Sequence, residues 1–112
     1  MQIVIEDEDG AIARVSLIGK LDIQGAEVVA LPLASLSGGK QNVLIDMSGV
    51  TFIASIGIRH LVSAAKTLSR RGGQLILISP TEAVVSVLTT AGITAMIPMV
   101  ASEREARAMI GA

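Results

Sequence analysis

The sequence predicts an α/β fold, with a mixed and mostly parallel sheet of four or five strands packed with about four helices. Short aliphatic runs alternate along the chain with longer segments whose apolar residues recur at the helical period. Hydrophobic residues make up 51% of the 112 residues and aromatic residues only 1%, so the core must be aliphatic. The first two strand-like runs are separated only by an acidic turn, which indicates a hairpin that adds an antiparallel edge.

The first part of the chain is predicted to form two strands, a helix and a third strand, at residues 2–6, 12–19, 26–37 and 42–46. The acidic turn at 7–10 joins the first two strands. Apolar residues of the helical segment share one face, but Pro32 predicts a bend or irregularity because proline lacks the amide hydrogen that a helix uses. The aliphatic run that ends at Asp46 is bounded by turn residues and is typical of a buried strand.

The second part is predicted to contain helices at 55–70, 80–92 and 102–111, a strand at 74–79 and a short segment at 95–100. Two arginines followed by two glycines end the first of these helices. Ser102 and Glu105 have the spacing of a capping box at the start of the last one. The order of strands and helices implies parallel strands joined by right-handed crossovers. We expect a single domain over residues 1–112.

Composition and charge argue against several classes of function. The formal net charge is -1, and no basic block extends beyond the pair Arg70 and Arg71, so no nucleic-acid surface is indicated. Cysteine is absent and there is one histidine, which argues against disulfides and zinc sites. The sequence has no signal-peptide pattern, and no apolar run reaches the roughly 18 residues of a membrane helix. We expect a soluble cytoplasmic protein without cofactor, metal, membrane or nucleic-acid contacts.

The most specific pattern of the chain runs from Asp46 to Gly57. A predicted strand ends at Asp46 and is followed by Met47 and Ser48, and Ser55-Ile-Gly57 opens the next helix. In parallel sheets, functional sites gather at the carboxyl ends of strands, where helices begin. Together with Leu21-Asp22 and the segment 72–93, this pattern resembles a STAS domain of the bacterial anti-sigma factor antagonist type. The similarity extends over nearly the whole chain.

This resemblance implies a STAS fold and a mode of action. Proteins of this type bind a serine kinase that is also an anti-sigma factor. The kinase phosphorylates the serine that opens the second helix, here Ser55, and the complex separates until a PP2C-type phosphatase removes the phosphate. ATP is bound by the kinase, so the antagonist needs no cofactor. Many relatives have Asp-Ser-Ser-Gly where this chain has Ala54, Ser55, Ile56 and Gly57, so the acceptor hydroxyl is kept while the acidic neighbour and the second serine are absent.

The predicted partner-binding residues are Asp22, Asp46, Thr51, Ile56, Gly57 and Arg59. Asp22, Asp46 and Gly57 are matched to the family motif by the resemblance. On a helical wheel, Ile56 and Arg59 lie away from the apolar stripe of the second helix. We therefore expect Ile56 to be partly exposed as an anchor, and Arg59 to reach a phosphate on Ser55 one helical turn earlier.

Most of these residues also have a purely structural interpretation. A serine at a helix start is typical of an N-cap, whose hydroxyl accepts a hydrogen bond from a backbone N–H, and this role is compatible with phosphorylation. Asp22 could cap the first helix, and Asp46 could close a turn with Ser48. Isolated surface apolar residues such as Ile56 are common, and Arg59 could be a solvated helix residue.

The sequence therefore predicts a binding module controlled by phosphorylation, with no enzymatic activity of its own and no specified oligomeric state. One alternative is a STAS scaffold or accessory subunit that binds its partner constitutively, as in lipid-transport or stress-sensing complexes. A small phosphotransfer or nucleotide-hydrolysing enzyme is a second alternative. The absence of a phosphate-binding loop, a metal cluster and a paired nucleophile and base argues against it.

Overall fold

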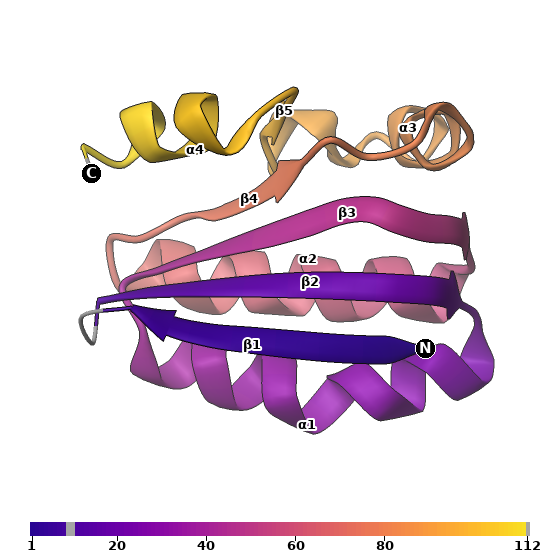
Figure 1. The fold of residues 1–112 in the computed structure, drawn as a ribbon, viewed down its shortest axis with the longest axis horizontal. Coiled ribbons are helices and arrows are strands. Elements are labelled where there is room, and N and C mark those ends of the chain that lie inside the picture. Colours follow the sequence, from indigo (N-terminus) through magenta and orange to yellow (C-terminus); the bar gives the residue numbers. More distant parts are fainter. Residues whose placement is uncertain (9–10, 112) are drawn as a thin grey trace.

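The computed structural model describes residues 1–8 and 11–111 (Figure 1). Its elements are, in chain order, β1 Gln2–Glu8, β2 Ile12–Leu21, α1 Ile23–Gly39, β3 Asn42–Ile53, α2 Ser55–Arg70, β4 Leu75–Ile78, α3 Glu82–Thr90, the 3-10 helix η1 Ile93–Ala95, β5 Met99–Val100 and α4 Glu103–Met109. The predicted α/β class is confirmed. Of the predicted acidic turn, residues 9 and 10 lie outside the described residues, and the two before them belong to β1.

The five strands form one mixed sheet in the order β1-β2-β3-β4-β5. β1 pairs with β2 in antiparallel fashion, and the other neighbouring strands are parallel. The carboxyl ends of β2, β3 and β4 therefore lie on the same edge of the sheet, and α1, α2 and α3 follow them (Figure 1). The predicted mostly parallel sheet with an antiparallel edge is confirmed.

Helices α1 and α2 cover one face of the sheet, where most of the apolar core lies. Alternate residues of each strand point to this face, and those that build the core include Val15, Leu17, Ile45, Met47, Leu75 and Leu77. The opposite face is the one that Figure 1 looks onto, and there α4 covers a smaller apolar cluster made of Ile12, Leu44, Ile76, Ile78 and Ala106. The two faces of the sheet therefore offer different surroundings to neighbouring residues of one strand.

Strand β3 is longer than its sequence predicts, because it continues past Asp46 to Ile53. Its pairing with β4 ends at Asp46 and Ile78, and the remainder pairs with β2 alone, with two register shifts. Gly49 allows this close pairing, since a Cβ there would lie 3.1 Å from Cγ1 of Ile18. The turn-like residues Ser48 and Gly49 are thus part of an irregular strand and not the end of one.

Helix α1 starts three residues earlier than predicted, at Ile23, and continues through Pro32 to Gly39. Its start is fixed by Asp22, whose side chain accepts a hydrogen bond of 2.8 Å from the backbone N–H of Gly25. At the other end, Arg71 donates hydrogen bonds to the carbonyl oxygens of Ser37 and Lys40, at 2.7 and 2.6 Å. The arginine satisfies carbonyl groups that a helix end leaves without partners.

Candidate functional site

Helix α2 begins with Ala54 as N-cap and Ser55 as its first residue. The interpretation of Ser55 as a side-chain N-cap is wrong, because no side chain accepts a hydrogen bond at this helix start. Ser55 is exposed, and its hydroxyl has no hydrogen-bond partner within residues 1–8 and 11–111. The backbone N–H groups of the first turn, which a helix cannot satisfy internally, are available to an anion.

The start of α2 is held against the end of β2 by backbone and side-chain contacts. The N–H of Ala54 donates a hydrogen bond of 2.9 Å to the carbonyl oxygen of Leu21. Gly57 is buried, and a Cβ at this position would lie 2.7 Å from Cγ of Leu21. A glycine at position 57 therefore lets α2 approach β2 closely and fixes where Ser55 emerges.

Asp22 and the residues around Ser55 come together at this edge of the sheet. A surface hollow of about 530 Å³ is lined by Asp22, Ile23, Gln24, Phe52 and Ala54. Ile23 is 69% exposed and Phe52 is 50% exposed, so the hollow is largely apolar and open to solvent. The carboxylate of Asp22 caps α1, as its structural interpretation predicts.

The other predicted residues of α2 and β3 have different degrees of exposure. Ile56 is half-buried, which agrees with the expected partial exposure, and Arg59 is exposed. Arg59 has no hydrogen bond or ion pair with the part of the chain that the structure describes. Thr51 is exposed near the carboxyl end of β3. The partner-binding role of these residues stays a prediction.

Asp46 lies elsewhere, on the sheet face opposite α1 and α2. Its neighbours in β3, Ile45 and Met47, belong to the core beneath those helices, so Asp46 points the other way. There it forms an ion pair of 3.3 Å with Arg14, which also donates a hydrogen bond of 2.6 Å to Glu103 of α4. The description of Asp46 as a strand-end residue is wrong, because β3 continues for seven more residues.

The carboxylate of Asp46 is stabilised in its ionised form. Partial burial opposes ionisation, but Oδ1 accepts hydrogen bonds of 2.9 and 2.7 Å from the N–H and hydroxyl of Ser48. These bonds, together with Arg14, lower the pKa of Asp46. Asp46 therefore closes a turn-like contact with Ser48, as its structural interpretation predicts, and joins β3 to α4 through Arg14.

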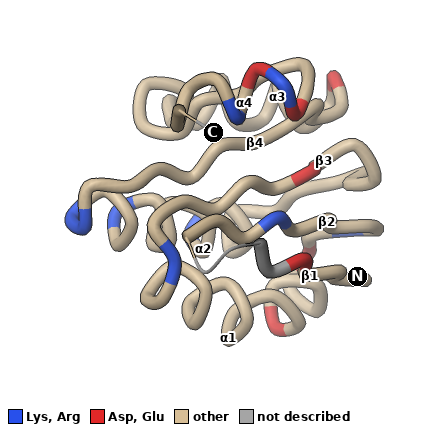
Figure 2. The backbone as a smooth tube through the Cα atoms, turned by 60° about the vertical axis from the view of Figure 1, so that its left-hand side comes forward, with Lys and Arg blue, Asp and Glu red and all other residues tan. Residues whose placement is uncertain are grey.

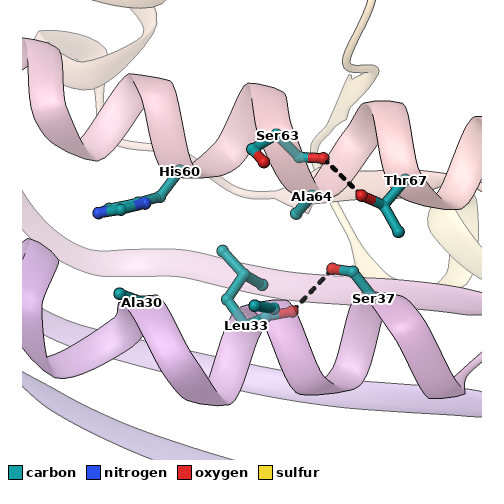
Figure 3. A pocket seen from close by; sticks show the side chains of 8 residues that line it. Ala30, Leu33, Ser37, His60, Ser63, Ala64 and Thr67 are labelled. Carbon is teal, nitrogen blue, oxygen red and sulfur yellow. Dashed lines mark hydrogen bonds between the residues drawn. The ribbon is translucent and has the colours of Figure 1, made fainter.

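A second hollow lies between α1 and α2, away from Ser55. It measures about 80 Å³ and is lined from α2 by His60, Ser63, Ala64 and Thr67 (Figure 3). Two of its hydroxyl groups are bonded within their own helices, from Ser37 to the carbonyl of Leu33 and from Thr67 to that of Ser63 (Figure 3). The small volume leaves little room for a ligand.

Within the described residues, no group of three or more His, Asp or Glu could hold a metal ion. None of the helices in that part of the chain has the length and apolar character needed to cross a membrane.

Sequence reasoning missed Phe52 and Ile23 at the site. The one aromatic residue of the chain, three positions before Ser55, is the signal that could have identified the first of them.

A model of the STAS domain matches residues 2–106. The chain belongs to the STAS domain family. BtrV of Bordetella bronchiseptica, a proposed anti-sigma factor antagonist, is 29% identical over 109 residues, which cover 96% of this chain and 92% of BtrV.

Solved structures support the same fold. The anti-sigma factor antagonist SpoIIAA in its unphosphorylated form superposes with a TM-score of 0.85 at 21% identity, covering 99% of this chain and 98% of SpoIIAA. The Bacillus cell fate determinant SpoIIAA in its phosphorylated form has a TM-score of 0.76 at 20% identity, covering 97% and 99% of the two chains. At these identities the structural likeness concerns the fold.

Proposed function

We propose that this STAS domain is an anti-sigma factor antagonist that is controlled by phosphorylation of Ser55. In this proposal the unmodified chain binds an anti-sigma factor that is also a serine kinase. Phosphorylation separates the two proteins, and a PP2C-type phosphatase restores the binding form. The observation that carries the proposal is the exposed hydroxyl of Ser55, which has no partner among the described residues and lies beside an apolar hollow at a helix start without a side-chain cap.

The chemical step would be carried out by the partner. The kinase transfers the γ-phosphoryl group of ATP to Oγ of Ser55, so that an O–P bond forms, the hydroxyl proton passes to the kinase and ADP leaves. Among the described residues, no His, Asp or Glu hydrogen-bonds Ser55, so nothing activates its hydroxyl as an enzyme nucleophile. The chain is therefore the substrate of the reaction and acts in the cytoplasm, where the kinase has ATP.

The site is suited to hold the phosphate once it is attached. A phosphate on Ser55 would meet the N–H groups of the first turn of α2 and the positive end of the helix dipole. Arg59, one turn further along, has no partner among the described residues and is within helical reach of that position. The group would add a charge of about -1.5 to -2 beside the apolar surface of Phe52 and Ile23, so a partner covering that surface would have to desolvate it.

The relatives support this function by their names. BtrV is a proposed anti-sigma factor antagonist, and SpoIIAA is known in unphosphorylated and phosphorylated forms.

The constitutive scaffold is the second candidate function. It is favoured by Ala54 and Ile56, which stand where many relatives have an acidic residue and a second serine.

Tagged wild-type, Ser55→Ala and Ser55→Asp chains, purified from the native cell, test the proposal. We expect wild type and Ser55→Ala to retain a kinase-type anti-sigma factor, identified by mass spectrometry, and Ser55→Asp to lose it. Intact-mass analysis of the untagged protein should show a single phosphate in at least one growth condition. The same partners on all three chains, with no phosphate in any condition, would support the scaffold and contradict the switch.

A further inference from the structure

The exposed face of α2 carries basic residues without acidic ones. Between Asp46 and Glu82 the sequence has no aspartate or glutamate, and its cations there are Arg59, Lys66, Arg70 and Arg71. Figure 2 shows charged positions spread over the molecule, and those of α2 are all basic. The segment that contains α2 is therefore positively charged, although the formal net charge of the whole chain is -1.

Three of these cations form a stripe along one side of the helix. Arg59, Lys66 and Arg70 are separated by seven and four residues, which places them on one face over about 16 Å. All three are exposed, and none has an ion pair or hydrogen bond with the residues that the structure describes. In contrast, Arg71 donates its hydrogen bonds to the end of α1. The basic stripe of Arg59, Lys66 and Arg70 is therefore not used within the fold.

An apolar groove runs beside this basic stripe. It measures about 520 Å³, and its lining combines cations with small and apolar side chains: Ala65, Lys66, Ser69, Arg70, Ala95 and Met96. Met96, next to η1, is 47% exposed. Methionine side chains adapt their shape to apolar partners. The groove thus offers an apolar contact directly beside Lys66 and Arg70, which have no ion pair with the described part of the chain.

We propose that the basic stripe and this groove form a docking surface for an acidic, amphipathic segment of a partner protein. The inference rests on the proposed function in that the chain acts by binding a partner. Charge complementarity selects an acidic occupant, and Met96 selects one that also carries apolar side chains. An extended polyanion such as DNA is disfavoured, because three cations on a chain of net negative charge neutralise few phosphates.

The docking surface also explains how a phosphate on Ser55 would weaken binding. Ser55 lies four residues before Arg59 and on the same side of α2 as the basic stripe. A phosphate there adds about two negative charges next to the three positive ones. The added charge lowers the attraction for an acidic segment and occupies Arg59, so phosphorylation acts on the Arg59 end of the surface.

Nuclear magnetic resonance on the isotope-labelled chain tests the inference with defined probes. The main probe is an amphipathic peptide of about four helical turns with leucine on one face and glutamate on the other, and its control carries lysine in place of glutamate. We expect saturable shift changes at residues 59–70 and at Met96 with the acidic peptide alone. In Lys66→Glu/Arg70→Glu the affinity should fall by about tenfold or more at low salt, since two attractions become repulsions. The matched charge change Arg104→Glu, an exposed arginine of α4, should leave the affinity unchanged.

Other outcomes overturn the inference. Shift changes that avoid α2, or equal binding of both peptides, would show that charge does not select the ligand. Stronger changes at α2 with a DNA duplex or with phosphatidylglycerol vesicles would assign the face to nucleic acid or membrane. If the kinase retained by the wild-type chain binds Lys66→Glu/Arg70→Glu equally well, this docking surface is wrong and the proposed function stands. If the acidic peptide binds as expected but no kinase is retained, the proposed function is wrong and the docking surface stands.

Discussion

Gly57 in α2 and Leu21 at the end of β2 approach so closely that a Cβ on the glycine would lie 2.7 Å from Cγ of Leu21 and 3.1 Å from its carbonyl oxygen. We predict that Gly57→Ala lowers the free energy of unfolding by about 1–3 kcal/mol, as overpacking usually does. Alanine's better helix propensity, worth up to about 1 kcal/mol, would offset only part of this loss. Denaturant unfolding followed by circular dichroism measures the change.

Gly38 in α1 provides the matched control for this substitution, because nothing lies within 4 Å of the Cβ that it would gain. Gly38→Ala should leave stability unchanged or raise it by up to about 1 kcal/mol. Equal effects of the two alanine substitutions would contradict the close contact between Gly57 and Leu21.

A negative charge at the start of α2 should stabilise the domain. The first turn of this helix has no acidic residue, so Ser55→Asp places an anion near unbonded N–H groups and should stabilise by about 0.3–1 kcal/mol. Ser69→Asp, an exposed position in the last turn, should have the opposite sign. Phosphorylated wild type should likewise keep or slightly raise its thermal midpoint. A fall of many degrees on phosphorylation would show that the switch works by melting the helix start.

Phe52 is predicted to be an anchor for the partner. Its side chain is 50% exposed and lines the hollow with Ile23 and Ala54, so Phe52→Ala removes apolar contact area without opening a core cavity. We expect the affinity for the retained kinase to fall by at least about 1 kcal/mol, with little change in stability. Leu31→Ala, at a residue of α1 that is 81% exposed, serves as the control and should leave affinity unchanged. Equal affinities of wild type and Phe52→Ala would exclude the hollow from the interface.

The ion pairs of Arg14 predict a loss of stability in acid. The hydrogen bond from Arg14, and a second one from Arg107, lower the pKa of Glu103 below its ordinary value of 4.5. A lowered pKa in the folded state means that the contribution of Glu103 is complete above that ordinary value. It is lost as pH falls through the lower, folded value, and Asp46 behaves in the same way.

Glu103→Gln tests this pH dependence. The variant should be less stable than wild type by at most about 1 kcal/mol near neutral pH, because the pair is partly solvated. The difference should shrink below pH 4.5, the ordinary pKa of glutamate. Glu27→Gln, an exposed position on α1, should show no such convergence. Parallel stability profiles of wild type and Glu103→Gln in acid would contradict the role given to the Arg14 pair.

The sequence predicts the fold well because its main signals are local. Aliphatic runs and helix punctuation, such as the capping box of Ser102 and Glu105, are confirmed in the structure. The extension of β3 to Ile53 was not predictable in this way, since it depends on pairing with β2 through two register shifts. The length of α1 likewise depends on Arg71, which lies more than thirty residues away from the carbonyl groups that it binds.

The candidate site was predicted in part. Capping chemistry predicted the role of Asp22 at the start of α1, since that signal is carried by neighbouring residues. The roles of Ser55 and Gly57 in binding and phosphorylation stay predictions of the motif. Asp46 was wrongly taken as the end of its strand, because the continuation of β3 depends on pairing with β2 and not on neighbouring residues. The hollow lined by Phe52 was missed because it forms only when the end of β3 and the start of α1 lie side by side in the fold.

The position of Phe52 makes its ring an intrinsic spectroscopic probe of binding. The sequence has one phenylalanine and no tyrosine or tryptophan. In a proton spectrum the aromatic region therefore contains the signals of one phenyl ring and of the imidazole of His60. The phenyl ring lines the hollow next to Ser55. Occupation of the site, or a phosphate beside it, can therefore be followed without any label. The same composition leaves almost no absorbance near 280 nm, so a mixture with any tryptophan-containing partner is read at that wavelength as the partner alone.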